Sequence, residues 1–177
     1  MITHERYRFA GLMAKLTVAL MVFAVTVTSC VWIFFDHMPV DMFARLGPSF
    51  QPSDVSALSR FLGFAVMMIP TGIGLYGLSH IRSTFLESEL GQPFSPKSVD
   101  GFRRFAWSVL AYVISVPMMK AALSVILSWH FPEGQKMLAI EISSNDVIGL
   151  FLAGLLVAVG HLFSEAHKLA EENAKFV

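Results

Sequence analysis

Residues 105–129, FAWSVLAYVISVPMMKAALSVILSW, form a long apolar stretch with a single charge at Lys120. About 20 apolar residues in a helix cover the hydrocarbon core of a bilayer, which is about 30 Å thick. Three other stretches, residues 11–35, 61–81 and 147–163, are comparably apolar and are bounded by charges or turn residues. The sequence therefore predicts an all-α integral membrane protein, a four-helix bundle whose second to fourth helices extend beyond the bilayer.

Composition leaves little room for a soluble domain. Apolar residues make up 55% of the chain, so we expect a single membrane domain over residues 1–177, with the lipid bilayer as a partner. The 13 Lys and Arg residues balance the 13 Asp and Glu residues. They do not form the basic stripe that nucleic-acid binding requires, so direct contact with nucleic acid is not expected.

Lys and Arg are concentrated on one side of the predicted membrane. Cytoplasmic loops of membrane proteins carry an excess of these residues. Nine of the 13 fall on the side that holds both termini: Arg6, Arg8, Lys15, Arg82, Lys97, Arg103, Arg104, Lys168 and Lys175. The bias predicts that both termini are cytoplasmic, together with the loop at 82–104 and the tail at 164–177.

Two helix starts are well marked. Ser95 before Pro96 is typical of a helix N-cap followed by a proline at the first helical position. Ser143 and Asp146 have the spacing of a capping box, which predicts the start of the fourth helix.

Glycines are frequent in the second span. Residues 72–77, GIGLYG, match the GxGxxG dinucleotide-binding pattern, but they lie within a span and no strand precedes them. Small residues in membrane helices instead allow backbones to approach closely. Small pairs also occur in the fourth span, at Gly149/Ala153 and Gly154/Ala158, so the second and fourth helices are predicted to pack together.

Lys120 is the most informative single residue. It lies about 4.5 Å beyond Pro117, the midpoint of its span, along the helix axis. A charged residue near the bilayer centre costs about 3 kcal/mol on insertion scales and indicates a functional site by default. No Asp or Glu lies inside a predicted span. Lys120 is therefore expected to be neutral, hydrated, bound to hydroxyls or carbonyls, or paired with a group outside this chain.

Two neighbours of this lysine complete a candidate intramembrane site. Pro117 frees a backbone carbonyl one turn before it, and Ser124 shares the same broad helix face. We therefore take Lys120, Pro117 and Ser124 as candidate functional residues. The alternative interpretation is a tolerated lysine that draws water into the bilayer.

Four histidines form a second group of candidate site residues. His37 and His130 lie at the outer ends of spans one and three, and His80 and His161 lie near the inner ends of spans two and four. A four-helix b-type cytochrome holds haem between histidines on facing helices. These residues lie at the interfaces and not deeper, so we expect interfacial anchors and no bound cofactor or metal.

Motifs of catalysis are missing. The sequence has no HExxH, GxSxG or phosphate-binding loop, so the protein is not predicted to be an enzyme and no catalytic residue is assigned. Breaks in the helices at Pro70 and Pro117 could line a small cavity, as discontinuous helices do in transporters. A small transporter or channel-like homo-oligomer that uses Lys120 is therefore the main alternative function.

Two segments carry a family resemblance. Residues 91–110, GQPFSPKSVDGFRRFAWSVL, and residues 161–177, HLFSEAHKLAEENAKFV, resemble the inner loop and the closing segment of a bacterial family, domain of unknown function 2975. The resemblance implies four helices in the bacterial inner membrane, no established activity and, in some relatives, a neighbouring small helix-turn-helix regulator.

The resemblance favours a signalling or regulatory role. The most ordered polar segments of the sequence, the inner loop and the tail, are both predicted to be cytoplasmic. We therefore expect a non-enzymatic membrane protein that docks a cytoplasmic regulatory protein, with Phe94, Arg103 and Arg104 as candidate contacts. An equally open interpretation is that Arg103 and Arg104 bind lipid phosphates and fix the topology.

Overall fold

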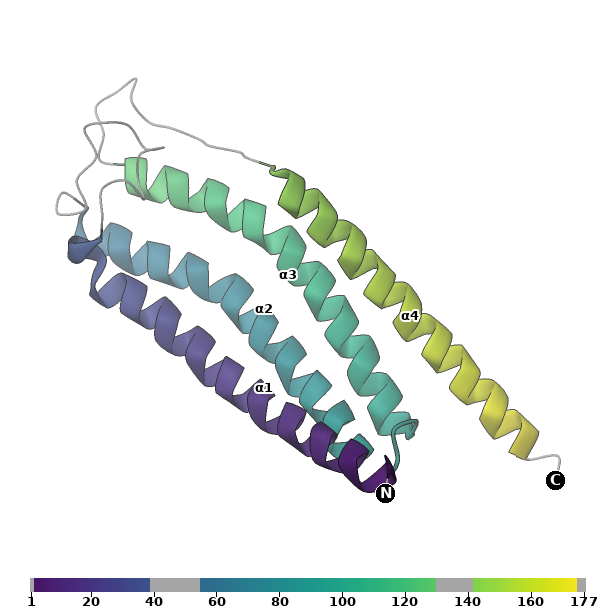
Figure 1. Cartoon of the computed structure of the whole chain (residues 1–177). Coiled ribbons are helices and arrows are strands. Elements are labelled where there is room, and N and C mark those ends of the chain that lie inside the picture. Colours follow the sequence, from purple (N-terminus) through teal and green to yellow (C-terminus); the bar gives the residue numbers. More distant parts are fainter. Residues whose placement is uncertain (1, 39–54, 130–141, 175–177) are drawn as a thin grey trace.

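The computed structural model describes residues 2–38, 55–129 and 142–174 and shows an all-α four-helix bundle (Figure 1). The elements are α1 (Ile2–Ile33), the short 3-10 helix η1 (Phe35–His37), α2 (Ala57–Glu89), α3 (Pro96–Ser128) and α4 (Ser144–Ala174). The predicted fold class is confirmed at this level.

All four α-helices are long and apolar enough to cross a membrane. The qualifying segments span 26 to 33 residues, and each contains an 18-residue stretch with a mean hydropathy between 1.7 and 2.2. Every helix is longer than the span predicted for it. The first helix already begins at Ile2, so extension beyond the apolar segment is not restricted to the second to fourth helices.

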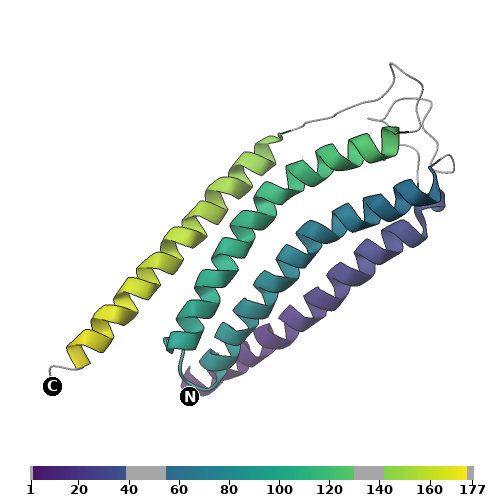
Figure 2. The same ribbon diagram turned by 180° about the vertical axis from the view of Figure 1, so that it is seen from behind.

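The helices pack in chain order. α2 packs against both α1 and α3, and α4 packs against α3. The start of α1, the α2–α3 connection and the end of α4 lie together at one end of the molecule, and Figure 2 shows the same order from behind. We call this the basic end, because Arg82, Lys97, Arg103, Arg104 and Lys168 lie there.

The prediction that the second and fourth helices pack together is wrong. Among the described residues α3 lies between α2 and α4, and it lies against Gly74 and Gly77 of α2. A Cβ atom added at Gly77 would overlap the Ser108 hydroxyl of α3. On α4, Gly149 faces Val113 of α3, and Gly154 has no neighbouring atom within 4 Å of such a Cβ.

The helix starts behave as predicted. Ser95 caps α3 by accepting a hydrogen bond from the Ser98 amide, and Pro96 occupies the first turn. Gly91 before it has a φ of 80°, a conformation that favours glycine. Ser143 and Asp146 form the capping box of α4 through reciprocal hydrogen bonds.

The prolines do not break their helices. α2 continues through Pro70 and α3 continues through Pro117. The helices curve gently (Figure 1), so the predicted discontinuous helices of a transporter are not present.

The end opposite the basic end is closed by an apolar cluster and an ion pair. Phe35, Val55 and Leu127 are buried together, with Trp32 stacked on Phe35 at 5.2 Å between ring centroids. The guanidinium group of Arg60 in α2 donates two hydrogen bonds, of 2.5 and 2.7 Å, to the carboxylate of Asp36. These contacts fix the relative height of α1, α2 and α3.

Candidate functional site

Arg103 and Arg104 lie at the basic end of α3, just before its apolar segment. Their position in the helix brings both within reach of Asp100, at 2.8 Å from Arg103 and 2.7 Å from Arg104. Both side chains are about half exposed, at 45% and 50%. Because two guanidinium groups share one carboxylate, the cluster keeps one net positive charge.

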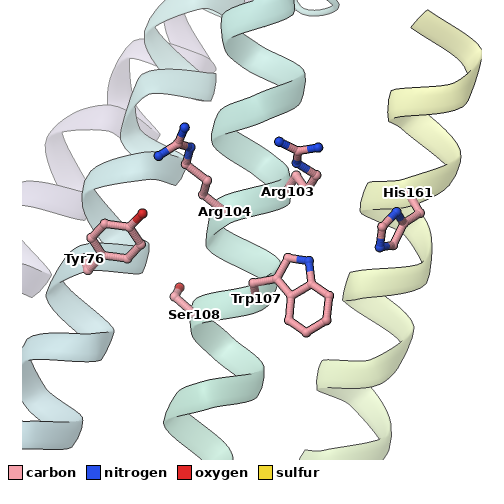
Figure 3. A pocket seen from close by; sticks show the side chains of 6 residues that line it. All are labelled: Tyr76, Arg103, Arg104, Trp107, Ser108 and His161. Atoms are coloured by element: carbon pink, nitrogen blue, oxygen red, sulfur yellow. The ribbon is translucent and has the colours of Figure 1, made fainter. Parts of the chain in front are cut away.

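These arginines line a pocket of about 460 Å³ between α2, α3 and α4. Its other lining residues are Tyr76, Trp107, Ser108 and His161. Figure 3 shows Tyr76 on α2 and His161 on α4 on either side of the four side chains from α3. Side chains with guanidinium, indole, imidazole and phenol groups, all of which can donate hydrogen bonds, therefore border one pocket.

Aromatic rings lie against the histidines. The rings of His161 and Trp107 lie edge to face with their centroids 6.4 Å apart. The rings of His80 and Tyr76 are arranged in the same way, with a centroid distance of 4.4 Å. Trp and Tyr are typical of the membrane–water interface, so this geometry agrees with histidines that act as interfacial anchors.

The cytochrome alternative finds no support in the helix order. His80 belongs to α2 and His161 to α4, and α3 lies between these helices. His37 lies in η1 and meets Phe34 at 6.5 Å, while its predicted counterpart His130 lies outside the described residues. Within the described ranges no group of three or more His, Cys, Asp or Glu side chains could hold a metal ion.

Phe94 lies at the tip of the α2–α3 connection. It is 67% exposed, and its ring lies edge to face against that of Phe163 in α4, with 6.3 Å between the ring centroids. Phe163 in turn meets Phe102 of α3 at 5.6 Å. Phe94 thus belongs to the α2–α3 connection and its aromatic contacts, whereas Arg103 and Arg104 line the pocket.

The α2–α3 connection is tied down by polar contacts that the sequence analysis missed. Glu87, only 11% exposed, accepts hydrogen bonds from Lys97 at 2.7 Å and from the Ser95 hydroxyl at 3.1 Å. Thr84 donates to the carbonyl of Ser98 at 3.0 Å. The available signal was an acidic residue and a lysine that flank the Gly91 turn.

Lys120 has a partner within the chain. Its Nζ lies 3.8 Å from Oδ1 of Asp146, in the first turn of α4. The four states expected for Lys120 did not include an acidic partner within the chain, and the contact with Asp146 corrects that expectation. The reason is the position of α4, which is shifted towards the basic end relative to the other helices, so that its capped start lies at the level of Lys120 (Figure 1).

The Lys120–Asp146 pair lies closer to the middle of the helices, and so deeper in the predicted membrane, than the Arg60–Asp36 pair. Gly77 of α2 is level with Ser108 of α3. Counting 1.5 Å per residue from that contact along both helices places Lys120 about 8 Å deeper than Arg60. The lysine is 43% exposed and Asp146 is 17% exposed, so the pair lies at the surface of the helix contact.

A second cavity of about 410 Å³ lies beside this pair, between α3 and α4. Pro117 and Asp146 line it, and its other lining side chains are apolar: Val113, Ile114, Met118, Ala121, Ile142, Val147 and Leu150. Ser124 is buried, and its hydroxyl donates to the carbonyl of Ala121 at 2.7 Å. The structure thus brings Pro117 and Asp146 together and leaves Ser124 on a buried face of α3.

Comparison with known proteins adds no assignment: no protein-family model, curated protein or solved structure matches this chain. The resemblance to domain of unknown function 2975 stays a prediction.

Proposed function

We propose that this protein is a non-enzymatic, multi-pass membrane protein of the bacterial inner membrane that docks a cytoplasmic regulatory protein at its basic end. The observation that carries the proposal is the tip of the α2–α3 connection. Leu90 and Phe94 are 75% and 67% exposed on a turn whose two sides are tied together by Glu87, Ser95 and Lys97.

A constrained tip of this kind suits recognition. Aromatic side chains are enriched in the cores of protein interfaces. A turn that is already held in one conformation loses little entropy on binding. The predicted orientation places the tip in the cytoplasm, and the family resemblance favours a small helix-turn-helix regulator as the partner.

Photocrosslinking in living cells tests this proposal. A photoreactive amino acid at Leu90 is compared with the same amino acid at Leu58, which is 68% exposed at the opposite end. We expect a soluble cytoplasmic protein crosslinked from position 90 and not from position 58, identified by mass spectrometry. The crosslink should weaken at least tenfold when Phe94→Ala removes the neighbouring aromatic ring, an effect of about 1.4 kcal/mol.

Two outcomes contradict docking at the tip. One is a crosslink from position 90 to lipid or to a second copy of the chain alone. The other is the same set of products from positions 90 and 58.

A specific observation favours a second candidate function, a small oligomeric transporter. Lys120 and Asp146 form an ion pair about 8 Å deeper than Arg60, beside a cavity of about 410 Å³. Lys120→Leu separates the two functions. It should abolish solute or ion flux into liposomes if the lysine handles the transported species, and it should leave crosslinking at position 90 unchanged if docking is the function.

A further inference from the structure

Several features of the pocket lined by Tyr76, Arg103, Arg104, Trp107, Ser108 and His161 point to an anionic ligand. Its volume of about 460 Å³ falls within the range of small-molecule sites, about 300–1,000 Å³. The two guanidinium groups have one carboxylate between them, that of Asp100. A positive charge and several donors therefore remain for oxygen atoms supplied from outside.

The depth of the pocket favours a membrane lipid as the source of those oxygen atoms. Arg104 immediately precedes the apolar segment that starts at Phe105, and Trp107 and Tyr76 lie at the same level. Phosphate groups of lipids lie where such aromatic residues meet basic ones. Because the pocket opens between α2, α3 and α4, a lipid reaches it from the bilayer without leaving the interface.

An apolar groove lies on the other side of the Gly77–Ser108 contact from this pocket. The groove has a volume of about 430 Å³, lies between α1, α2 and α3, and shares Ser108 with the pocket. Phe105 and Tyr112 line it on α3, and Leu75 and Leu78 line it on α2. Because the Gly77–Ser108 contact separates this groove from the pocket, it is not part of the headgroup site.

We propose that the Arg103–Arg104 pocket binds the phosphate headgroup of an anionic phospholipid. Arg103 and Arg104 hold the phosphate, and Tyr76, Trp107 and His161 lie around it. This site is separate from the docking tip at Leu90 and Phe94, so either proposal can fail without the other.

Quenching of Trp107 fluorescence by brominated lipids tests the site. The purified full-length protein is titrated with brominated phosphatidylglycerol and with brominated phosphatidylcholine of the same acyl chains. The Trp107→Phe variant identifies the part of the signal that comes from the pocket, since Trp32 and Trp129 are also present. We expect wild type to prefer the anionic lipid by at least about fivefold, the effect of one basic residue near a charged membrane surface.

Matched variants separate the pocket from general surface charge. Arg103→Gln/Arg104→Gln should abolish the preference at Trp107. Lys15→Gln/Arg82→Gln removes the same charge from the same end outside the pocket and should keep it. Arg103→Lys/Arg104→Lys keeps the charge but lacks the planar guanidinium group that binds phosphate through two hydrogen bonds. This variant should therefore keep a reduced preference for the anionic lipid. A reduced but measurable preference would also show that the variant is folded.

Three results would overturn the proposal. The first is an equal affinity of wild type for both lipids. The second is an equal loss of preference in the two Gln double variants. The third is displacement of the lipid by millimolar inorganic phosphate, which would make the occupant a soluble anion.

Discussion

The contact between α2 and α3 and the contact between α3 and α4 are built differently. Along α2–α3, small residues bring the backbones close together. A Cβ atom at Gly101 would lie 2.7 Å from the Ser83 hydroxyl, 2.8 Å from the Thr84 hydroxyl and 2.9 Å from the carbonyl oxygen of His80. Gly77 allows the same approach against Ser108.

Along α3–α4 the glycines have room. A Cβ atom at Gly149 or at Gly160 would find its nearest neighbour at 3.5 Å, an ordinary contact, and one at Gly154 would find no atom within 4 Å. The ring of Phe163 spans the gap near the basic end. A cavity of about 410 Å³ lies in this contact, and α4 also forms one wall of the pocket of about 460 Å³.

The difference shows where the molecule is rigid and where it can admit a ligand. Van der Waals packing of small residues drives helix association in lipid, so the closely packed α2–α3 contact is the stable part. In the described part of the chain, the contact with α4 includes aromatic pairs and the Lys120–Asp146 ion pair, and it borders two cavities. The proposed ligand sites therefore border α4.

Gly101→Ala should give the largest loss of stability. The added methyl group must displace the backbone carbonyl of His80 or the helix itself, and overpacking of this kind costs about 1–3 kcal/mol. Gly154→Ala is the matched control, because nothing lies within 4 Å of its Cβ position. Reversible unfolding in mixed micelles measures both, and equal effects of the two variants would contradict the contrast between the contacts.

Phe163→Ala should loosen α4 selectively. It removes edge-to-face contacts with Phe94 and Phe102, and aromatic pairs contribute about 0.5–1.5 kcal/mol each beyond their buried area. Hydrogen exchange should accelerate in α4 and stay unchanged in α2. Leu162→Ala, at a neighbouring side chain that is 63% exposed, is the control. Faster exchange in α2 and α4 alike would show that the two contacts are not independent.

Lys120→Leu should raise stability slightly if the lysine has only a structural role. Its ion pair with Asp146 is partly exposed and long, at 3.8 Å, while a lysine within the bilayer is costly. Asp146 keeps its hydrogen bonds from Ser143. The expected gain in the free energy of unfolding is about 0.5–1 kcal/mol. A loss of stability would instead show that the pair holds α4 in place.

The smallest effect is expected from the ion pair at the closed end. Hydrogen bonds from Arg60 lower the pKa of Asp36 below its ordinary value of 3.8. The pair therefore contributes its full stability above that value, and the contribution is lost as the pH falls through the lowered pKa of the folded state. Thermal unfolding between pH 5 and pH 2.5 should show a small drop in wild type that is missing in Asp36→Asn.

Much of the fold could be predicted because it depends on local properties. Span length follows from runs of apolar residues, and the starts of α3 and α4 follow from Ser95 with Pro96 and from Ser143 with Asp146. Each of these signals acts within one or two helical turns, so no knowledge of neighbouring helices is needed.

The candidate sites were only partly predictable for the same reason. Arg103 and Arg104 were identified from their charge, but Tyr76 and Trp107 were not assigned to a site. His161 was considered only as an anchor or a haem ligand. The pocket joins residues of three helices, and no spacing in the sequence specifies which of them share it. The one available signal was the pair of aromatic residues near the membrane boundary.

The sequence by itself determined four apolar helices, their ends and the charged side that joins them. Only the tertiary structure decided that α3 lies between α2 and α4, that α4 is shifted towards the basic end, and that Asp146 therefore meets Lys120. The physical reason is that lipid solvates every apolar helix face equally well. Helix order and register then depend on how closely particular side chains fit, and that fit exists only between helices.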